Sequence, residues 1–304
     1  MRKDAGTSST KACGGTDVRD GSASPVTRSA DMNKVHVADG AHLECKAGSR
    51  ARSAVLTKLV APLTIVALLG LWQLACSTGL VPPFMLPSPV RVVQALVGDW
   101  PLLAGHAATS LAEAGMGLAA GVALGFVAAL AMDRFDLLYR AFYPIVVLTQ
   151  TIPTVAIAPL LVLWFGYGML PKVVLIVVAT FFPITVGLLE GLRSVDPDEI
   201  DLMRAMGASR LQILHHVKLP AALPQLFSGL KISAAYAIVG AVIAEWLGGF
   251  SGLGVYMTRV RKAYSFDKMF AVIFLISGLS LALMWIVDAL RRALMPWERQ
   301  SREP

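Results

Sequence analysis

Long apolar runs dominate the chain after residue 58 and alternate with short polar segments. A helix needs roughly 20 predominantly apolar residues to cross the hydrocarbon core of a bilayer, and six of these runs reach or approach that length. They cover residues 59–79, 106–132, 143–165, 172–192, 225–249 and 269–290. The fifth run also carries two charged residues, Lys231 and Glu245. The pattern predicts an all-α membrane protein built from six spans.

Residues 1–50 are polar and differ from the rest of the chain. They hold 8 Lys/Arg and 6 Asp/Glu within a stretch rich in Gly, Ser, Thr and Ala. Because this composition buries too little apolar surface to offset the entropy of ordering, we expect a disordered cytoplasmic tail. A secretory signal is not expected, since no continuous apolar stretch precedes Leu59; translation from Met32 is an alternative start. The expected division is a tail over 1–50, a transmembrane domain over 51–297 and a cytoplasmic end over 298–304.

Basic residues in the short loops favour an orientation with both termini in the cytoplasm. With the N-terminus inside, the cytoplasmic side collects 13 Lys/Arg and the opposite side 6. Cytoplasmic loops of membrane proteins carry such an excess, although the cluster at 259–268 runs against it. The net charge of +7 therefore reports topology, and no nucleic-acid partner is expected.

Composition supports the membrane class and excludes several others. Hydrophobic residues make up 56% of the 304 residues and charged residues 15%, with a mean hydropathy of +0.64. The three cysteines, Cys13, Cys45 and Cys76, are too widely spaced to suggest a disulfide framework or a zinc site. His215 and His216 point about 100° apart on a helix and make a poor metal pair. No metal or cofactor is therefore expected.

The second apolar run carries glycines at four-residue spacing. Gly117, Gly121 and Gly125 fall on one face of a helix, so the backbone of another helix can approach closely there. We expect a tight helix–helix contact along this face.

The polar segment between the fourth and fifth runs, residues 193–222, opens with signals for a helix. Asp196 is an N-cap in front of Pro197, and Glu199 stands three residues after the cap, as in a reciprocal capping box. Gly207 fits the left-handed residue that ends this helix. The spacing predicts a short helix over 197–206.

A second helix follows in the same segment. Ser209 is its expected N-cap, and Leu219-Pro220 is expected to stop it. The first helix has an apolar side that lipid, its own bundle or the groove of a partner can bury. Its apolar positions are Ile200, Leu202, Met203 and Met206. The segment predicts a helix–turn–helix on the cytoplasmic side, clamped between two membrane spans.

This spacing resembles the signature loop of permease subunits of ATP-binding-cassette importers, written EAA, three residues, Gly, nine residues, I-x-L-P. Gly207 is followed by nine residues and then Val217-Lys218-Leu219-Pro220, while Asp201-Leu202-Met203 occupies the opening triplet and keeps only its acidic first residue. The resemblance implies a coupling helix that binds a groove of a cytoplasmic ATPase. It assigns ATPase-coupling roles to Asp201, Leu202, Met203, Gly207, Leu219 and Pro220.

The resemblance extends over residues 60–297 and favours one branch of the family. The segments PSPVRVVQAL, TQTIPTVAIAPLLVLWFGYG and AVIAEWLGGFSGLGVYM resemble the nitrate, sulfonate and taurine branch, and AEWLGG is similar to members associated with thiamine pyrimidine precursors. This implies a type I importer permease of the bacterial inner membrane that transports a small anionic or heterocyclic solute. The implied partners are two copies of a cytoplasmic ATP-binding subunit, a periplasmic or lipid-anchored substrate-binding protein, a second copy of the chain and membrane lipid.

Other classes of protein require motifs that the chain lacks. No GxxxxGK[ST] is present, so ATP hydrolysis is expected from a separate polypeptide and the chain itself is not expected to be an enzyme. HExxH and GxSxG are also absent, which argues against an intramembrane protease. The main alternative is a self-sufficient secondary transporter. That class needs broken spans at matching positions in two halves, whereas the prolines here cluster in the third run.

Polar groups inside apolar spans mark candidates for a translocation path, because ionisable residues there usually face a bundle interior or a cavity. Glu245 stands beside Trp246 near the outer end of the fifth run. One interpretation is that Glu245 contacts the solute or gates the path. The other is a hydrogen-bonded structural carboxylate or a residue at the membrane interface.

The third run supplies the second set of path candidates. Gln150 and Thr151 precede Pro153, which together with Pro159 removes backbone donors and predicts a kink. Carbonyls freed by a kink are tolerated within protein or along a cavity. The kinked helix either lines the path or serves packing.

Overall fold

The computed structural model describes residues 60, 62–79, 82 and 85–296. The chain divides into two units, residues 1–68 and residues 69–304, and the elements that form the site belong to the second. The predicted tails lie outside the described residues, as does the first residue of the first predicted span.

Every regular element in the described part of the chain is helical. The elements of the second unit are α2 (Pro89–Gly98), α3 (Trp100–Arg134), α4 (Asp136–Thr151), α5 (Thr154–Phe165), α6 (Met169–Arg193), α7 (Pro197–Ala205), α8 (Arg210–Ile213), the π-helical turn η1 (Leu214–Lys218), α9 (Leu219–Gly248), α10 (Leu253–Lys262) and α11 (Phe266–Leu294). The predicted all-α class is confirmed.

Four helices are long and apolar enough to cross a bilayer: α3, α6, α11 and the continuous helix Arg210–Gly248 that α8, η1 and α9 form. The pair α4 and α5 passes the same test only as one span, bent by 99°. The four helices and the bent pair correspond to the second to sixth predicted runs. Within the first run the described part forms the shorter apolar helix Pro62–Ser77.

The glycine face of α3 packs tightly against α6, as predicted. A Cβ at Gly117 would lie 2.5 Å from the Cβ of Ile176, and a Cβ at Gly121 would collide with the Thr180 hydroxyl. Gly125 meets Ile184 in the same way. Lipid-embedded helices associate through such close packing, so this ladder fixes the spacing of α3 and α6.

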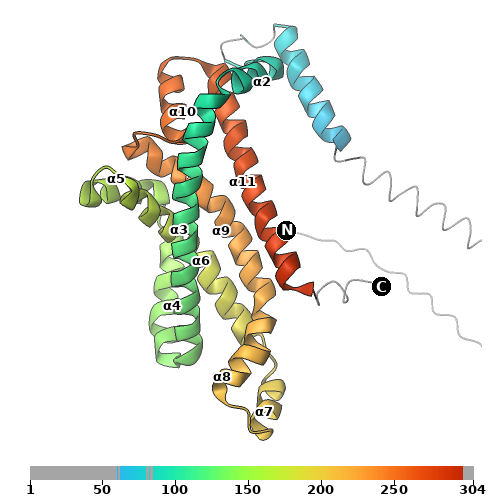
Figure 1. Cartoon of the computed structure of the whole chain (residues 1–304), viewed down its shortest axis with the longest axis vertical. Helices are drawn as coiled ribbons and strands as arrows, with labels where there is room; N and C mark the ends of the chain where they lie inside the picture. The colour runs from blue at the N-terminus through green and yellow to red at the C-terminus, as the bar shows by residue number, and fades with distance from the viewer. Residues whose placement is uncertain (1–59, 61, 80–81, 83–84, 297–304) are drawn as a thin grey trace, which may run out of the picture. The chain divides into compact units, whose positions relative to one another are not determined.

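Glycines also bring α6 against α9. A Cβ at Gly191 would lie 2.7 Å from the Cα of Ala222, and one at Gly229 would overlap the Pro183 carbonyl. The helix α6 therefore packs against both α3 and α9 with no room for a side chain at these glycines. Figure 1 shows α7 and α8 at one end of this bundle and α10 with α2 at the other, termed here the α7 end and the α10 end.

The loop at the α7 end folds largely as its capping signals predict. The Asp196 carboxylate accepts a hydrogen bond from the Asp198 N–H at 3.0 Å, and Gly207 adopts the left-handed conformation with φ of 82°. A complete capping box forms at the second helix instead of the first, because Ser209 and Gln212 exchange both bonds. At the first helix the Asp196 carboxylate accepts a backbone hydrogen bond, but the described structure has no return bond from the Asp196 N–H to the Glu199 side chain.

The predicted stop at Leu219-Pro220 is wrong. The helix that starts at Arg210 continues to Gly248 through the π turn η1. The Leu219 N–H bonds back to the Leu214 carbonyl, five residues earlier, and this wider turn precedes the proline. Pro220 follows directly after this turn, as the second residue of α9.

Candidate functional site

The elbow between α4 and α5 forms one wall of the site. α4 ends at Thr151, Ile152 is extended with φ of −82° and ψ of 122°, and α5 begins after Pro153. A proline disfavours helical geometry in the residue before it, which explains the break at this point. The kink predicted at Pro153 is confirmed. Pro159 produces no break, because α5 continues through it.

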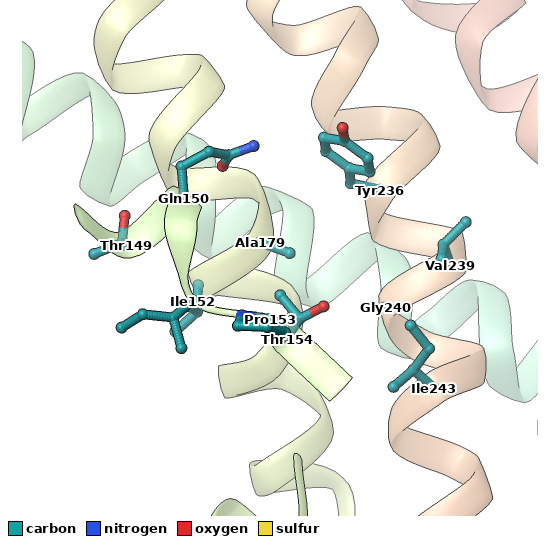
Figure 2. A pocket seen from close by; sticks show the side chains of 11 residues that line it. Thr149, Gln150, Ile152, Pro153, Thr154, Ala179, Tyr236, Val239, Gly240 and Ile243 are labelled. Carbon is teal, nitrogen blue, oxygen red and sulfur yellow. The ribbon is translucent and has the colours of Figure 1, made fainter. Parts of the chain in front are cut away.

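A pocket of about 220 Å³ lies between this elbow, α6 and α9. Its lining residues are Thr149, Gln150, Ile152, Pro153, Thr154, Val178, Ala179, Tyr236, Val239, Gly240 and Ile243. Figure 2 shows the Gln150 amide and the Tyr236 ring on facing sides of this space. The pocket combines a few polar groups with an apolar floor, which is the usual composition of a small-molecule site.

The polar groups of the pocket are uncharged and mostly available. The Thr149 hydroxyl donates to the Val146 carbonyl at 2.6 Å, so only its lone pairs remain. Among the described residues, Gln150, Thr154 and Tyr236 have no hydrogen-bond partner for their side chains. Tyr236 is 43% exposed. These groups can therefore bind a polar solute without first breaking a bond within the protein.

Glu245 lies outside the lining of the pocket and within a buried polar network. The residue is 2% exposed. Its Oε1 accepts a hydrogen bond from the Ser110 hydroxyl at 2.6 Å, and its Oε2 accepts one from the Gly254 N–H at 2.6 Å. In this conformation the carboxylate has the contacts of a structural, hydrogen-bonded group.

The same network anchors the start of α10. The first N–H groups of a helix lack partners within the helix. Here the Gly252 N–H donates to His106 Nδ1 at 3.0 Å, and the Leu253 N–H donates to Ser110 Oγ at 2.8 Å. With Glu245 bound to Gly254, side chains of α3 and α9 satisfy three successive donors. The glycines of GGFSGLG allow this approach, since a Cβ at Gly252 would collide with the Glu245 carboxylate.

A buried ion pair lies beside this network. Lys172 Nζ lies 2.6 Å from Glu113 Oε1, and the two side chains are 7% and 3% exposed. Glu113 Oε2 has no hydrogen-bond partner in the described structure. Sequence reasoning missed this pair. The available signal was an acid inside the second apolar run together with a lysine at the start of the fourth.

The α10 end carries a second, more accessible polar contact. Asp99 Oδ2 lies 2.7 Å from Lys268 Nζ and accepts a hydrogen bond from the Tyr256 hydroxyl at 2.7 Å. The bond from Lys268, followed by that from Tyr256, holds the pKa of Asp99 below its ordinary value. Burial, reinforced by Asp99, raises the pKa of Tyr256. These contacts link the α2–α3 corner to α10 and α11.

The predicted path residues thus fall into three places. Gln150 and Pro153 line the pocket, and Glu245 belongs to the buried network. The Thr151 hydroxyl donates to the Leu148 carbonyl at 2.8 Å, and Trp246 is 45% exposed; neither is among the residues that line the pocket. Tyr236, which faces Gln150, was not predicted, since a single tyrosine in an apolar run gives no signal.

The predicted coupling residues gather at the α7 end. Asp201 forms an exposed ion pair with Arg204 at 2.8 Å, and Leu202 is 62% exposed. Met203 is half-buried, whereas Met206 is 75% exposed. Apolar side chains presented outward on a capped helix form a surface that a partner can cover.

An ion pair fixes this loop to the membrane bundle. Lys218, the last residue of η1, binds both carboxylate oxygens of Asp133 at 2.8 and 2.9 Å. Asp133 lies at the end of α3, so α3 and the loop are joined directly. Leu219 and Pro220 follow at the start of α9 and are part of this junction rather than of the exposed surface.

Comparison with known proteins agrees with this arrangement. The family model described as "Binding-protein-dependent transport system inner membrane component" matches residues 121–296. A probable ABC transporter permease protein of Haemophilus influenzae is 40% identical over 232 residues, which cover 76% of this chain and 95% of the relative.

Two further relatives have names that state a substrate. The formylaminopyrimidine transport permease protein ThiX of Halalkalibacterium halodurans is 35% identical, over 79% of this chain and 96% of that protein. The taurine transport system permease protein TauC of Escherichia coli is 32% identical, over 77% and 88%.

A solved structure shows the same fold. The MetNI methionine ABC transporter in an inward-facing conformation is similar with a TM-score of 0.53 and 24% identity, over 64% of this chain and 96% of that one. With more than half of its length matched by one family model, and with relatives aligned along nearly their full lengths, the chain belongs to the inner-membrane permease family of binding-protein-dependent ABC importers.

Proposed function

We propose that two copies of this chain form the pathway of a bacterial importer and that each copy couples it to a cytoplasmic ATPase subunit. The observation that carries this proposal is the loop α7–α8. It is capped at both helices, fixed to α3 through Lys218, and continuous with the span α9, yet it presents Leu202 and Met206 to solvent. A partner that binds this apolar face can move the loop as a rigid unit, and the loop then moves the span to which it is joined.

The proposed roles in coupling differ between residues. Asp201, Leu202 and Met203 form the face that enters the groove of the ATPase, and Gly207 turns the chain so that α8 can follow. Leu219 and Pro220 connect the loop to α9. The chain contributes no P-loop to this reaction, so ATP is bound and hydrolysed by the partner.

The remaining partners in the proposal are those that the family implies. A periplasmic or lipid-anchored binding protein delivers the solute at the α10 end, and a second copy of the chain completes the path. The α7 end and both termini lie in the cytoplasm, which the excess of Lys/Arg on that side supports. The solute in this proposal is a small heterocycle, such as the formylaminopyrimidine in the name of one relative, or a small sulfonate, such as the taurine in the name of another.

The path residues form part of the same proposal. Gln150, Pro153 and, next to them, Thr151 shape the solute pocket at the elbow. Glu245 acts through α10, whose start it holds, and Trp246 flanks it at the outer end of α9. In this interpretation Glu245 controls access to the path rather than binding the solute directly.

The first test is purification of the full chain from its native membrane with mass spectrometry of what remains bound. A co-purifying P-loop ATPase at equal stoichiometry supports the proposal. A chain that purifies alone and still moves a solute down an ion gradient in liposomes supports the alternative, a self-sufficient secondary transporter.

The second test uses the complex and a matched pair of glycine variants. Gly207→Asp introduces a charge and backbone strain at the ATPase surface, so we expect ATPase activity that no longer responds to the permease. Gly166→Asp is the control, because Gly166 also has a positive φ, 75°, and open space around it, but lies outside the loop α7–α8. Equal coupling in both variants would refute the assigned docking surface.

A further inference from the structure

The Gln150 side chain gives the pocket a chemically specific edge. A primary amide presents two N–H donors next to one carbonyl acceptor. Its best complement is a ligand edge that carries an acceptor next to a donor, which is how a glutamine binds the ring nitrogen and exocyclic amino group of adenine. An aminopyrimidine has this edge. A sulfonate offers acceptors only, so it leaves the Gln150 carbonyl unmatched.

The other walls of the pocket suit a small flat ring. Tyr236 faces Gln150 and supplies both an aromatic surface and a free hydroxyl (Figure 2). Aromatic rings of ligands stack on such side chains with little dependence on their exact substitution. The volume of about 220 Å³ is below the ~300–1,000 Å³ of pockets that hold drug-sized ligands, so a single ring fits better than a fused system.

The electrostatics of the bundle disfavour an anion at this position. No charged side chain lines the pocket among the residues described. The same bundle buries two carboxylates, Glu113 on α3 and Glu245 on α9, and one ammonium, Lys172 on α6, which is already paired with Glu113. The lysine on α9, Lys231, is paired with Asp288. A desolvated anion without a cation is costly inside a membrane protein, and surplus carboxylates raise that cost.

From these observations we infer that the pocket between Gln150 and Tyr236 binds an uncharged, single-ring heterocycle with an adjacent donor and acceptor, of the aminopyrimidine class, and not a sulfonate. The inference rests on the proposed function, in which this pocket belongs to the solute path. It selects between the two solute classes that the relatives leave open.

The experiment is saturation-transfer NMR on the purified full chain in lipid nanodiscs, with millimolar 4-aminopyrimidine or ethanesulfonate as the probe. This measures binding to the permease itself, without the binding protein that would otherwise select the solute. We expect transfer to the ring protons of 4-aminopyrimidine and none to the methyl and methylene protons of ethanesulfonate. Unsubstituted pyrimidine, which lacks the exocyclic donor, is expected to bind more weakly.

Matched variants locate the binding site. Gln150→Leu and Tyr236→Phe each remove hydrogen-bonding groups and are expected to weaken 4-aminopyrimidine binding roughly two- to tenfold. The controls are Gln94→Leu on α2 and Tyr264→Phe, since both side chains are exposed and outside the pocket. The controls are expected to bind like the unchanged chain.

Three results would overturn the inference: ethanesulfonate binding equal to that of 4-aminopyrimidine, 4-aminopyrimidine binding that is unaffected by both pocket variants, or no binding of either probe. Each leaves the proposed function standing, because the ATPase coupling of the complex is measured separately. Equal coupling in Gly207→Asp and Gly166→Asp, together with intact 4-aminopyrimidine binding, would refute the assigned docking surface and keep the solute pocket.

Discussion

Lys172→Met is the substitution with the largest expected effect on stability. It removes the ammonium that lies 2.6 Å from Glu113 Oε1 while both side chains are more than nine-tenths buried. Breaking a buried pair by removing one partner costs about 3–5 kcal/mol, because an uncompensated charge stays inside. The upper part of that range is expected here, since Glu113 Oε2 has no other hydrogen-bond partner in the described structure.

The assay is unfolding of the purified chain in mixed micelles with increasing SDS, followed by circular dichroism. The matched control is Arg140→Met, which breaks the exposed pair with Asp136 and is expected to cost about 0.3–0.5 kcal/mol. The double variant Glu113→Leu/Lys172→Met removes both charges and is expected to recover most of the loss. If Lys172→Met were as mild as Arg140→Met, or if the double variant recovered nothing, the two charges would not be coupled as the geometry indicates.

Three further predictions concern packing, the α10 anchor and pH. Gly121→Ala pushes α3 away from Thr180 and is expected to destabilise the bundle by about 1–3 kcal/mol in the same assay, whereas Gly115→Ala, in open space on the same helix, is expected to be neutral or stabilising. Glu245→Ala frees the first donors of α10, so amide hydrogen exchange there is expected to accelerate; equal exchange in Glu245→Ala and in the exposed control Glu190→Ala would contradict the anchoring role. The lowered pKa of Asp99 means that its stabilising contacts are present above the ordinary pKa of about 3.8 and are lost as the pH falls through the lowered value. Asp99→Asn lacks this contribution at every pH, so its stability is expected to fall less steeply than that of the unchanged chain as the pH is lowered. Acid unfolding followed by fluorescence measures this, and an equally steep fall in both proteins would argue against the contribution of Asp99.

The features that the sequence predicted well are those that depend on neighbours along the chain. Apolar runs located the spans, and glycine spacing on the second run predicted the contact between α3 and α6. Capping residues located α7 and α8 because each cap acts within three residues. The break at Pro153 was predictable for the same reason, since a proline constrains the residue next to it.

Features that depend on residues far apart in the chain were not predicted. Glu113 and Lys172 are 59 positions apart and meet only because the glycine ladder brings α3 against α6. The role of Glu245 depends on the loop before α10, which folds back so that the Gly254 N–H binds its carboxylate. The predicted stop at Pro220 is wrong because the helix passes into α9 through the π turn η1, and such a turn has no signature in the local sequence.

The continuity of the helix Arg210–Gly248 gives the chain a single lever between its two ends. Its 39 residues extend about 58 Å at 1.5 Å per residue, so a 5° tilt about one end displaces the other by about 5 Å. Glu245 lies near the other end of this helix, and its carboxylate accepts a hydrogen bond from the N–H of Gly254 at the start of α10. If the proposed ATPase displaces the loop, the displacement would reach α10 through this one helix, and the bending stiffness of the π turn η1 would set how much of it arrives.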